Sequence, residues 1–195
     1  MATFNMTVDG YHHSAWGVSF GDSLPSAITT DDDNSSYVWE TSDGDDIYFT
    51  FAAPPVASAQ IASITSLQVF IKAAYTHASN TNALDVKFST SGNDADTITV
   101  SGGSSYALYN GLAKILQDPP PIGSAWAYSD LESLQVQFEK NGAADIRKQI
   151  RVSYLYVTVT YVPTGYTNDV MGVDSGDIST INGIATANIS KVNGV

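Results

Sequence analysis

The feature that most constrains this chain is an alternation of apolar and other residues with a period of two. Ile47, Phe49 and Phe51 follow it, separated by Tyr48 and Thr50. In a β-strand such spacing places the apolar side chains on one face, so each segment is expected to be half buried. The same spacing recurs in three further segments: Leu84, Val86 and Phe88; Ile98 and Val100; and Leu134, Val136 and Phe138.

Turn-forming dipeptides such as Asp43-Gly44 and Asn141-Gly142 stand between these segments. Helical periodicity is scarce, and only 129–134 is expected to form a short helix, capped by Ser129 or Asp130. Two packed antiparallel sheets would bury all the apolar faces together. The sequence therefore predicts an all-β protein built as an antiparallel β-sandwich.

The longest expected strand changes its pattern part way along. Its apolar residues fall on even numbers from Ile150 and on odd numbers from Leu155. Either a β-bulge near Tyr154 to Tyr156 turns the strand over, or its middle is covered on both faces. We favour the bulge.

Charge and composition exclude several classes of function. The formal net charge is −12 and the isoelectric point is near 4.2, so DNA, RNA and anionic lipid surfaces would be repelled. The chain has no cysteine, which removes disulfides, thiolate zinc sites and cysteine nucleophiles. Neither a signal peptide nor an apolar run of about 20 residues is present, so we expect no membrane span and no classical export.

The composition changes after Pro163, and the rest of the chain is repetitive. Val170, Ile181 and Val192 each begin a similar four-residue unit and stand eleven residues apart. A fixed internal period indicates a repetitive structure. We therefore divide the chain into a sandwich domain, 1–162, and a linker with an extended repeat tail, 163–195.

The repeats carry isolated apolar anchors, too few to form a core of their own. A helical coil is disfavoured because each unit contains a glycine and Asn-Gly prefers turns. The tail should therefore dock, either on its own sandwich or, as we prefer, on a neighbouring subunit. The predicted docking residues are Val170, Val173, Ile178, Ile181, Ile184, Ile189 and Val192.

Several segments resemble a loose family of bacteriophage structural proteins. The stretch Ile122 to Trp126, followed by Leu134 to Val136 and Val152 to Val157, looks like the second half of jelly-roll-like domains in such proteins, and Asp31 to Tyr37 with Asp45 to Phe51 looks like the first half. The closing repeats resemble Ile-x-Lys-Ile-Asn-Gly-Val tails of phage head and tail proteins. The resemblance implies a jelly-roll-like sandwich in a virion, with other virion proteins or further copies of itself as partners.

No catalytic motif stands out, and we expect a protein that is not an enzyme. His12 and His13 would point to opposite faces of a strand, so they cannot easily serve one metal or one nucleophile. Acidic loops supply hard oxygen ligands suited to calcium, although we prefer to explain them as solvated or turn-stabilising aspartates. The calcium candidates are Asp31, Asp33, Asp43, Asp45 and Asp46. No other cofactor is expected.

The aromatic residues are the remaining signal. Trp and Tyr rings exposed on a sandwich can stack on sugars, whereas Trp126, after three prolines, is expected to fill the core.

Two functions stay open. The first is a multi-copy capsid decoration, minor head or other assembly protein docked through its tail. The second is a tail or fibre module that binds host surface glycan.

Overall fold

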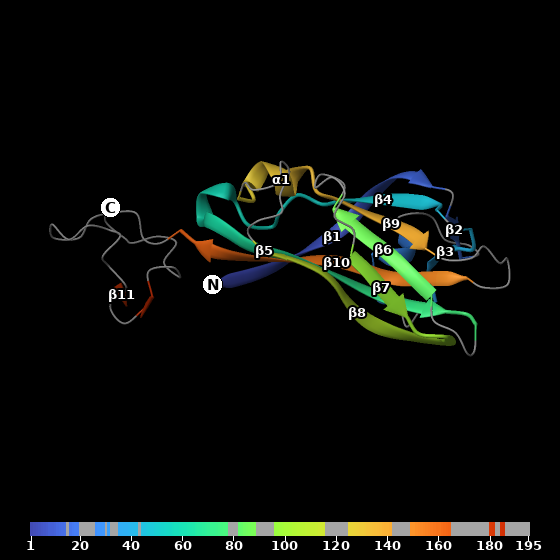
Figure 1. Cartoon of the computed structure of the whole chain (residues 1–195). Coiled ribbons are helices and arrows are strands. Elements are labelled where there is room, and N and C mark those ends of the chain that lie inside the picture. Colours follow the sequence, from blue (N-terminus) through green and yellow to red (C-terminus); the bar gives the residue numbers. More distant parts are fainter. Residues whose placement is uncertain are drawn as a thin grey trace.

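The computed structural model describes residues 1–14, 16–19, 26–29, 31, 35–42, 44–77, 82–88, 96–115, 125–141, 149–164, 180–181 and 184–185. Two antiparallel sheets, called sheet A and sheet B here, pack face to face as a jelly-roll-like sandwich (Figure 1). The all-β fold predicted from the alternation is confirmed. In the described part of the chain the helical elements are short: η1 (Ser26–Ile28), η2 (Ser58–Gln60) and α1 (Tyr128–Glu132).

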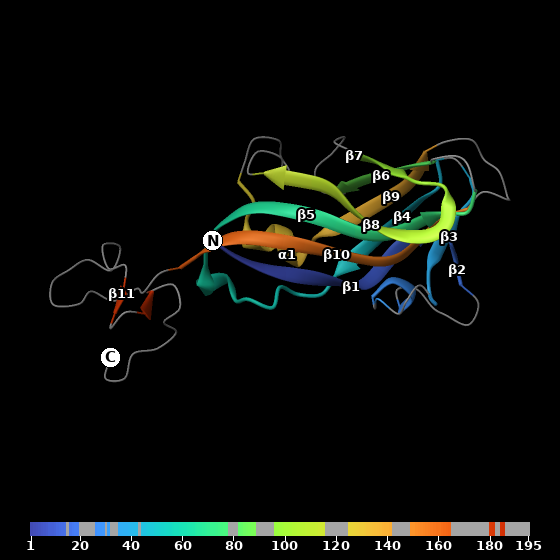
Figure 2. The same cartoon turned by 90° about the horizontal axis from the view of Figure 1, so that it is seen from below.

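Sheet A is built around the longest strands. Its order is β8, β5, β10 and then, along the far edge of β10, the first half of β1 together with β3 and β2. Figure 2 shows β5, β10 and β1 side by side. The bounds are β1 (Ala2–Ser14), β2 (Gly17–Val18), β3 (Val38–Glu40), β5 (Ile61–Tyr75), β8 (Gly103–Ile115) and β10 (Ile150–Pro163).

Sheet B contains the second half of β1, followed by β4, β9, β6 and β7. Strand β1 belongs to both sheets because residues 2–7 pair with β10 and residues 8–14 pair with β4. Its register shifts between Val8 and Gly10, where a bulge turns the strand from one sheet to the other. The bounds are β4 (Asp46–Phe51), β6 (Asn82–Phe88), β7 (Asp96–Val100) and β9 (Gln135–Asn141).

The core lies between the sheets and is made of the alternating residues. Ile47 and Phe49 are fully buried, and Phe51 is 6% exposed. Each such side chain stabilises the fold by about 1.5–3 kcal/mol of apolar transfer. Trp126 is 4% exposed and meets the edge of the Phe88 ring, so its predicted place in the core is confirmed.

The change of pattern in β10 is a bulge, as predicted, but it lies slightly before the expected position near Tyr154 to Tyr156. The register with β5 shifts between Val152 and Tyr154, which makes Ser153 the extra residue. Val152 and Leu155 therefore both face the core, although two residues separate them. This bulge decides which side chains of β10 reach the outer face.

The short helix forms, with different bounds from those predicted. α1 spans Tyr128–Glu132, and its N-cap is Ala127, not Ser129 or Asp130. The Ala127 N–H donates to Oδ2 of Asp130 at 2.7 Å, so Asp130 acts from inside the first turn. No helix among the described residues is both long and apolar enough to cross a bilayer.

Part of the repeat tail is described. β11 (Thr180–Ile181) pairs with β12 (Ile184–Ala185), with Ile181 opposite Ile184. The Asn182-Gly183 dipeptide, for which the sequence favours a turn, lies outside the described residues. The docking residues Val170, Val173, Ile178, Ile189 and Val192 lie outside the described residues.

Candidate functional site

Aromatic side chains gather on the outer face of sheet A because of the bulge at Ser153. Beyond the bulge, Leu155 and Val157 point into the core, so Tyr154 and Tyr156 point outward. Phe70 also points outward, since its neighbours Val69 and Ile71 are fully buried. Strand pairing then brings these outward side chains from β5 and β10 together.

The rings are in contact with one another. Phe70 is the direct cross-strand partner of Tyr156, and their rings stack at 4.8 Å between centroids with planes 1° apart. Tyr154 lies 5.3 Å from Tyr156 at an angle of 44°. Phe70, Tyr154 and Tyr156 are all partly exposed, so part of this ring cluster is accessible from the outer face of sheet A.

The environment of Tyr156 reflects this packing. Burial raises the pKa of its phenol above the ordinary value, and the neighbouring Tyr154 raises it further. The hydroxyl therefore stays protonated throughout the neutral range. A protonated phenol is both a hydrogen-bond donor and an acceptor, as a ligand rich in hydroxyl groups requires.

A second aromatic pair extends the cluster toward the start of β10. Tyr37, next to β3, and Tyr106, on β8, have ring centroids 6.4 Å apart. The guanidinium of Arg151 lies over the Tyr37 ring at 4.5 Å from its centroid. We name these five rings the aromatic strip: Tyr37, Phe70, Tyr106, Tyr154 and Tyr156.

Polar and apolar side chains border the aromatic strip. On the β1 side, the Thr158 hydroxyl donates to Oδ1 of Asn5 at 2.9 Å, and Thr7 is the cross-strand partner of Tyr156. On the β8 side, Leu108 is 58% exposed, opposite Lys72. The surroundings therefore combine hydrogen-bonding groups with accessible apolar area.

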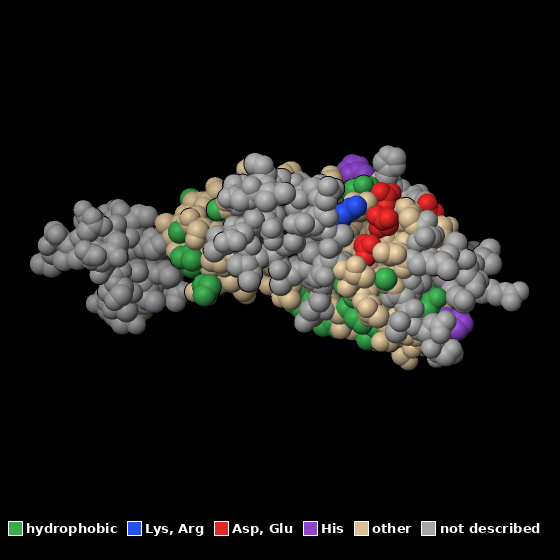
Figure 3. All heavy atoms as spheres, viewed as in Figure 1, with side chains coloured by type: hydrophobic (Ala, Val, Ile, Leu, Met, Phe, Trp, Pro, Cys, Tyr) green, Lys and Arg blue, Asp and Glu red, His purple; other side chains and the backbone are tan. Residues whose placement is uncertain are grey.

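The outer face of sheet B has a different character. Asp46 is the cross-strand partner of Glu139, which in turn is opposite Asp85. We name this set the carboxylate row. Figure 3 shows the acidic side chains gathered over β4, β9 and β6, with a basic side chain beside them.

The carboxylates of this row have protein partners. Gln137 Nε2 donates to Asp46 Oδ2 at 2.8 Å, and Lys87 Nζ lies 3.6 Å from Glu139 Oε2. Asp85 accepts from the Thr97 hydroxyl at 2.6 Å and from Asn141 Nδ2 at 2.9 Å. The row is a satisfied polar network that fixes the register of three strands.

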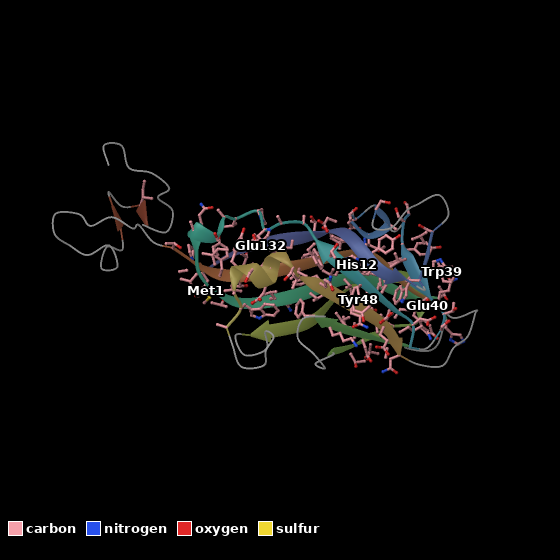
Figure 4. The ribbon with its side chains drawn as sticks, turned by 90° about the horizontal axis from the view of Figure 1, so that it is seen from above. Met1, His12, Trp39, Glu40, Tyr48 and Glu132 are labelled. Atoms are coloured by element: carbon pink, nitrogen blue, oxygen red, sulfur yellow. The ribbon has the colours of Figure 1, made fainter. Side chains whose placement is uncertain are left out.

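Tyr48 continues this network toward β1 through its hydrogen bond to Asp46. Tyr48 is the partner of His12 across β4 and β1, and Figure 4 shows the two side chains near each other. The pKa of the Tyr48 phenol is raised, mainly by burial, then by its hydrogen bond to Asp46 and by the charges of Asp46 and Glu139.

Among the predicted calcium ligands that the structure describes, Asp31 lies apart from Asp45 and Asp46. Asp31 forms an ion pair of 2.6 Å with Lys72 over sheet A. Asp45 accepts a bond from the Trp16 indole through its backbone carbonyl, and Asp46 belongs to the carboxylate row. Asp33 and Asp43 lie outside the described residues. Within the described part, no three acidic, histidine or cysteine side chains come together to hold a metal ion.

The sequence reasoning did not single out the residues of the aromatic strip. The even-to-odd switch in β10 was the available signal, because it places Tyr154 and Tyr156 on one face. Nothing in the sequence shows that Phe70, 86 positions before Tyr156 in the chain, is its cross-strand partner. Long-range register is needed for that.

No known protein-family profile and no curated protein matches the chain. Some solved structures are similar at low identity. The C-terminal CBM6 of LamC, a marine laminarinase from Zobellia galactanivorans, has 8% identity and a TM-score of 0.45, covering 82% of this chain and 99% of its own. The carbohydrate-binding module CBM6cm-2 of Cellvibrio mixtus lichenase 5A, solved with cellotriose, has 14% identity and a TM-score of 0.44, covering 82% and 97%.

The CBM36-1 domain of a xylanase from the hindgut metagenome of Trinervitermes trinervoides has 12% identity and a TM-score of 0.44, covering 84% of this chain and 100% of its own. At these identities and scores, the likeness assigns no function to this chain.

Proposed function

We propose that this chain is a non-catalytic saccharide-binding module that holds its ligand against the aromatic strip. The observation that carries the proposal is the grouping of half-exposed rings on the outer face of sheet A. Phe70, Tyr154 and Tyr156 lie in direct contact there. Aromatic faces stack on the apolar C–H faces of sugars, while nearby polar groups bond to hydroxyls.

The border of the strip supplies such polar groups. Thr7 and Asn5 lie beside the rings on β1, and Gln68 lies opposite Thr158 on β5. These are neutral donors and acceptors of the type that hydroxyl groups pair with. The combination of rings and neutral polar side chains fits a saccharide better than it fits a purely apolar partner.

The arrangement of carboxylates supports a non-catalytic function. A glycoside hydrolase of the usual type needs two carboxyl groups flanking the bound sugar, one with its pKa raised by an apolar pocket. On the described residues of the aromatic strip's face, the nearby carboxylate is Asp31, which Lys72 neutralises. The carboxylate row lies on the other sheet.

The test is a binding comparison of single tyrosine variants of the full chain. Tyr156→Ala and Tyr154→Ala should each weaken binding to a saccharide found on a glycan array by about tenfold, the equivalent of ~1.4 kcal/mol lost per stacking ring. Tyr11→Ala is the matched control, because Tyr11 is 43% exposed on β1 and outside the strip.

Thermal unfolding of each variant separates lost binding from lost folding. The proposal holds if the strip variants unfold cooperatively and bind weakly while Tyr11→Ala binds like the wild type. It fails if no saccharide on the array binds, or if all three variants bind equally well.

We also propose that the repeat tail attaches the sandwich to a larger assembly, such as a phage particle containing many copies. The supporting observation is Ile184, which is 55% exposed in β12 although it is a large aliphatic residue. An exposed isoleucine in a paired strand is suited to docking. The phage resemblance of the repeats supports the same proposal.

Particle incorporation tests this second proposal. Ile181→Asp combined with Ile184→Asp should leave the melting temperature of the sandwich nearly unchanged and abolish incorporation, because charged side chains cannot enter an apolar contact. Thr180→Asp is a control on the same strand. Equal incorporation of the double variant and the wild type contradicts docking through the tail.

A further inference from the structure

Arg151 is held in a fixed position at one end of the aromatic strip. Its Nε and Nη2 both donate to Oε1 of Gln149, at 3.0 and 2.7 Å. Its guanidinium plane rests on the Tyr37 ring at 4.5 Å. Two independent contacts therefore orient a side chain that would otherwise lose considerable rotamer freedom on binding a ligand.

Within the part of the chain that the structure describes, these contacts leave some of the N–H groups of Arg151 without a partner. A guanidinium carries five N–H groups. In Arg151, the edge formed by Nε and Nη2 is bonded to Gln149. The opposite edge, made of Nη1 and Nη2, retains a pair of parallel N–H groups. Such a pair matches the two oxygens of a carboxylate or a sulfate in a bidentate bond.

The charge around Arg151 is unusual for this chain. Acidic residues outnumber basic ones by 20 to 8, yet among the described residues no carboxylate lies within ion-pair distance of Arg151. The nearby cation Lys72 is neutralised by Asp31 at 2.6 Å. The outward side chains of β5, β8 and β10 include no carboxylate. Among the described residues of this face, Arg151 is thus the positive charge that no carboxylate neutralises.

The net charge of −12 opposes anion binding, but the carboxylate row, the acidic cluster that the structure describes, acts on the strip only at long range. The carboxylate row lies on the outer face of the other sheet, and packed sheets are ~10 Å apart. Charges that far apart are largely screened at physiological ionic strength, where the Debye length is ~8 Å. Arg151 is therefore less affected by the carboxylate row than by charges on its own face.

Arg151 is close enough to the rings to contact the same ligand. It pairs with Ala74, while Tyr154 pairs with Lys72, two positions along β5. Two positions in a strand correspond to ~7 Å. A saccharide chain on Tyr154 and Tyr156 therefore passes within reach of the guanidinium.

We propose that Arg151 binds an anionic substituent, a uronic carboxylate or a sulfate ester, on the saccharide that the aromatic strip holds. The inference rests on the proposed saccharide-binding function and adds to it a ligand class, acidic polysaccharides. Tyr37 and Gln149 are positioning residues in this arrangement. They hold the guanidinium so that its free edge faces the ligand.

Matched pairs of polymers test the inference on the full chain. Polygalacturonate is compared with its methyl-esterified form, and dextran sulfate with dextran, so that each pair differs only in charge. The wild type should bind one acidic polymer at least tenfold more tightly than its neutral partner, and the pair that responds identifies carboxylate or sulfate as the anion.

Variants of the two cations then locate the effect. Arg151→Gln should bring the acidic polymer to the affinity of the neutral one, and Arg151→Lys should restore only part of the difference, because an ammonium cannot bind bidentately. Lys87→Gln is the control, since Lys87 lies on sheet B beside Glu139. It should leave the preference unchanged.

Three outcomes overturn the inference. Equal binding of charged and neutral polymers by the wild type overturns it, as does a preference that survives Arg151→Gln. An equal loss on both polymers in Arg151→Gln shows that the arginine acts only structurally. If a neutral glycan binds in a Tyr156-dependent manner, the proposed function stands without the inference. If no glycan binds, both fail.

Discussion

The outer faces of the two sheets are built from opposite chemistry on the same kind of backbone. The face of sheet A is held together by ring contacts, with Phe70 stacked on Tyr156. The face of sheet B is held together by hydrogen bonds and ion pairs, with Gln137 bonded to Asp46 and Lys87 near Glu139. Both faces fix strand register through cross-strand pairs.

The difference indicates which face is available to a ligand. On sheet B, the donors and acceptors of the carboxylate row are directed at one another, so a ligand would have to displace protein partners. On sheet A, the stacked rings of Phe70 and Tyr156 are only partly buried, so part of their surface is accessible. A surface stabilised by rings can therefore also bind, whereas a satisfied polar network mainly stabilises.

The largest expected effect comes from removing a ring. Phe70→Ala removes the stack on Tyr156 and the apolar area buried with it. Because the side chain is half buried, we expect a loss of about 2 kcal/mol in the free energy of unfolding, below the 3–5 typical of a core Phe. Urea denaturation at low and high salt measures it.

Ring contacts do not depend on ionic strength, so the loss should be the same in 0.05 M and 1 M salt. Gln68→Ala, the next outward position on β5, is the control and should cost well under 1 kcal/mol. A salt-dependent loss at Phe70 would contradict the division between the two faces.

A smaller effect is expected on sheet B from Gln137→Met, which keeps the side-chain volume and removes the bond to Asp46. Gln137 is only 4% exposed, so its bond to a carboxylate should be worth about 1.5 kcal/mol, at the low end for charged partners. A double-mutant cycle with Asp46→Ala isolates this coupling. Strict additivity of the two substitutions would show that the bond contributes nothing.

The next effect in size belongs to the exposed ion pair. Lys87 and Glu139 are 26% and 36% exposed and 3.6 Å apart, so Lys87→Met should cost less than about 1 kcal/mol. Because water and ions reach the pair, the cost should vanish in 1 M salt. The Phe70→Ala loss measured alongside is expected to persist, and a Lys87 effect that also persists would point to packing of its aliphatic stem.

The sequence predicted the sheets well because local alternation reports burial directly. Ile47, Phe49 and Phe51 face the core as their spacing indicated. The switch in β10 predicted a bulge, and the register confirms one at Ser153. These features depend on neighbours in sequence.

Features that depend on distant neighbours were not predictable. The stack of Phe70 on Tyr156 depends on the register between β5 and β10. Lys140, near the end of β9, is fully buried. Its position in the alternation predicts an inward side chain, whereas its charge predicts an exposed one. The docking role of the tail and its phage partner stay predictions, since most of the anchors lie outside the described residues.

The smallest expected effect is a dependence of stability on alkaline pH, and it concerns Tyr48 beside the carboxylate row. Its pKa is raised above the ordinary value of 10.0 by burial, by the bond to Asp46 and by the charges of Asp46 and Glu139. Between about pH 10 and the higher pKa of the folded state, the folded chain holds a proton that the unfolded chain releases. Its contribution to stability is therefore complete below pH 10 and is lost as the pH rises through the folded pKa.

Tyr48→Phe should lower the free energy of unfolding slightly at pH 8, because the bond to Asp46 disappears, and should flatten its decline above pH 10. Urea denaturation of both proteins from pH 8 to 11 measures the two slopes. Tyr11→Phe is the control for the other phenols, and a Tyr48→Phe slope equal to that of the wild type would show that the carboxylate row does not act on this phenol.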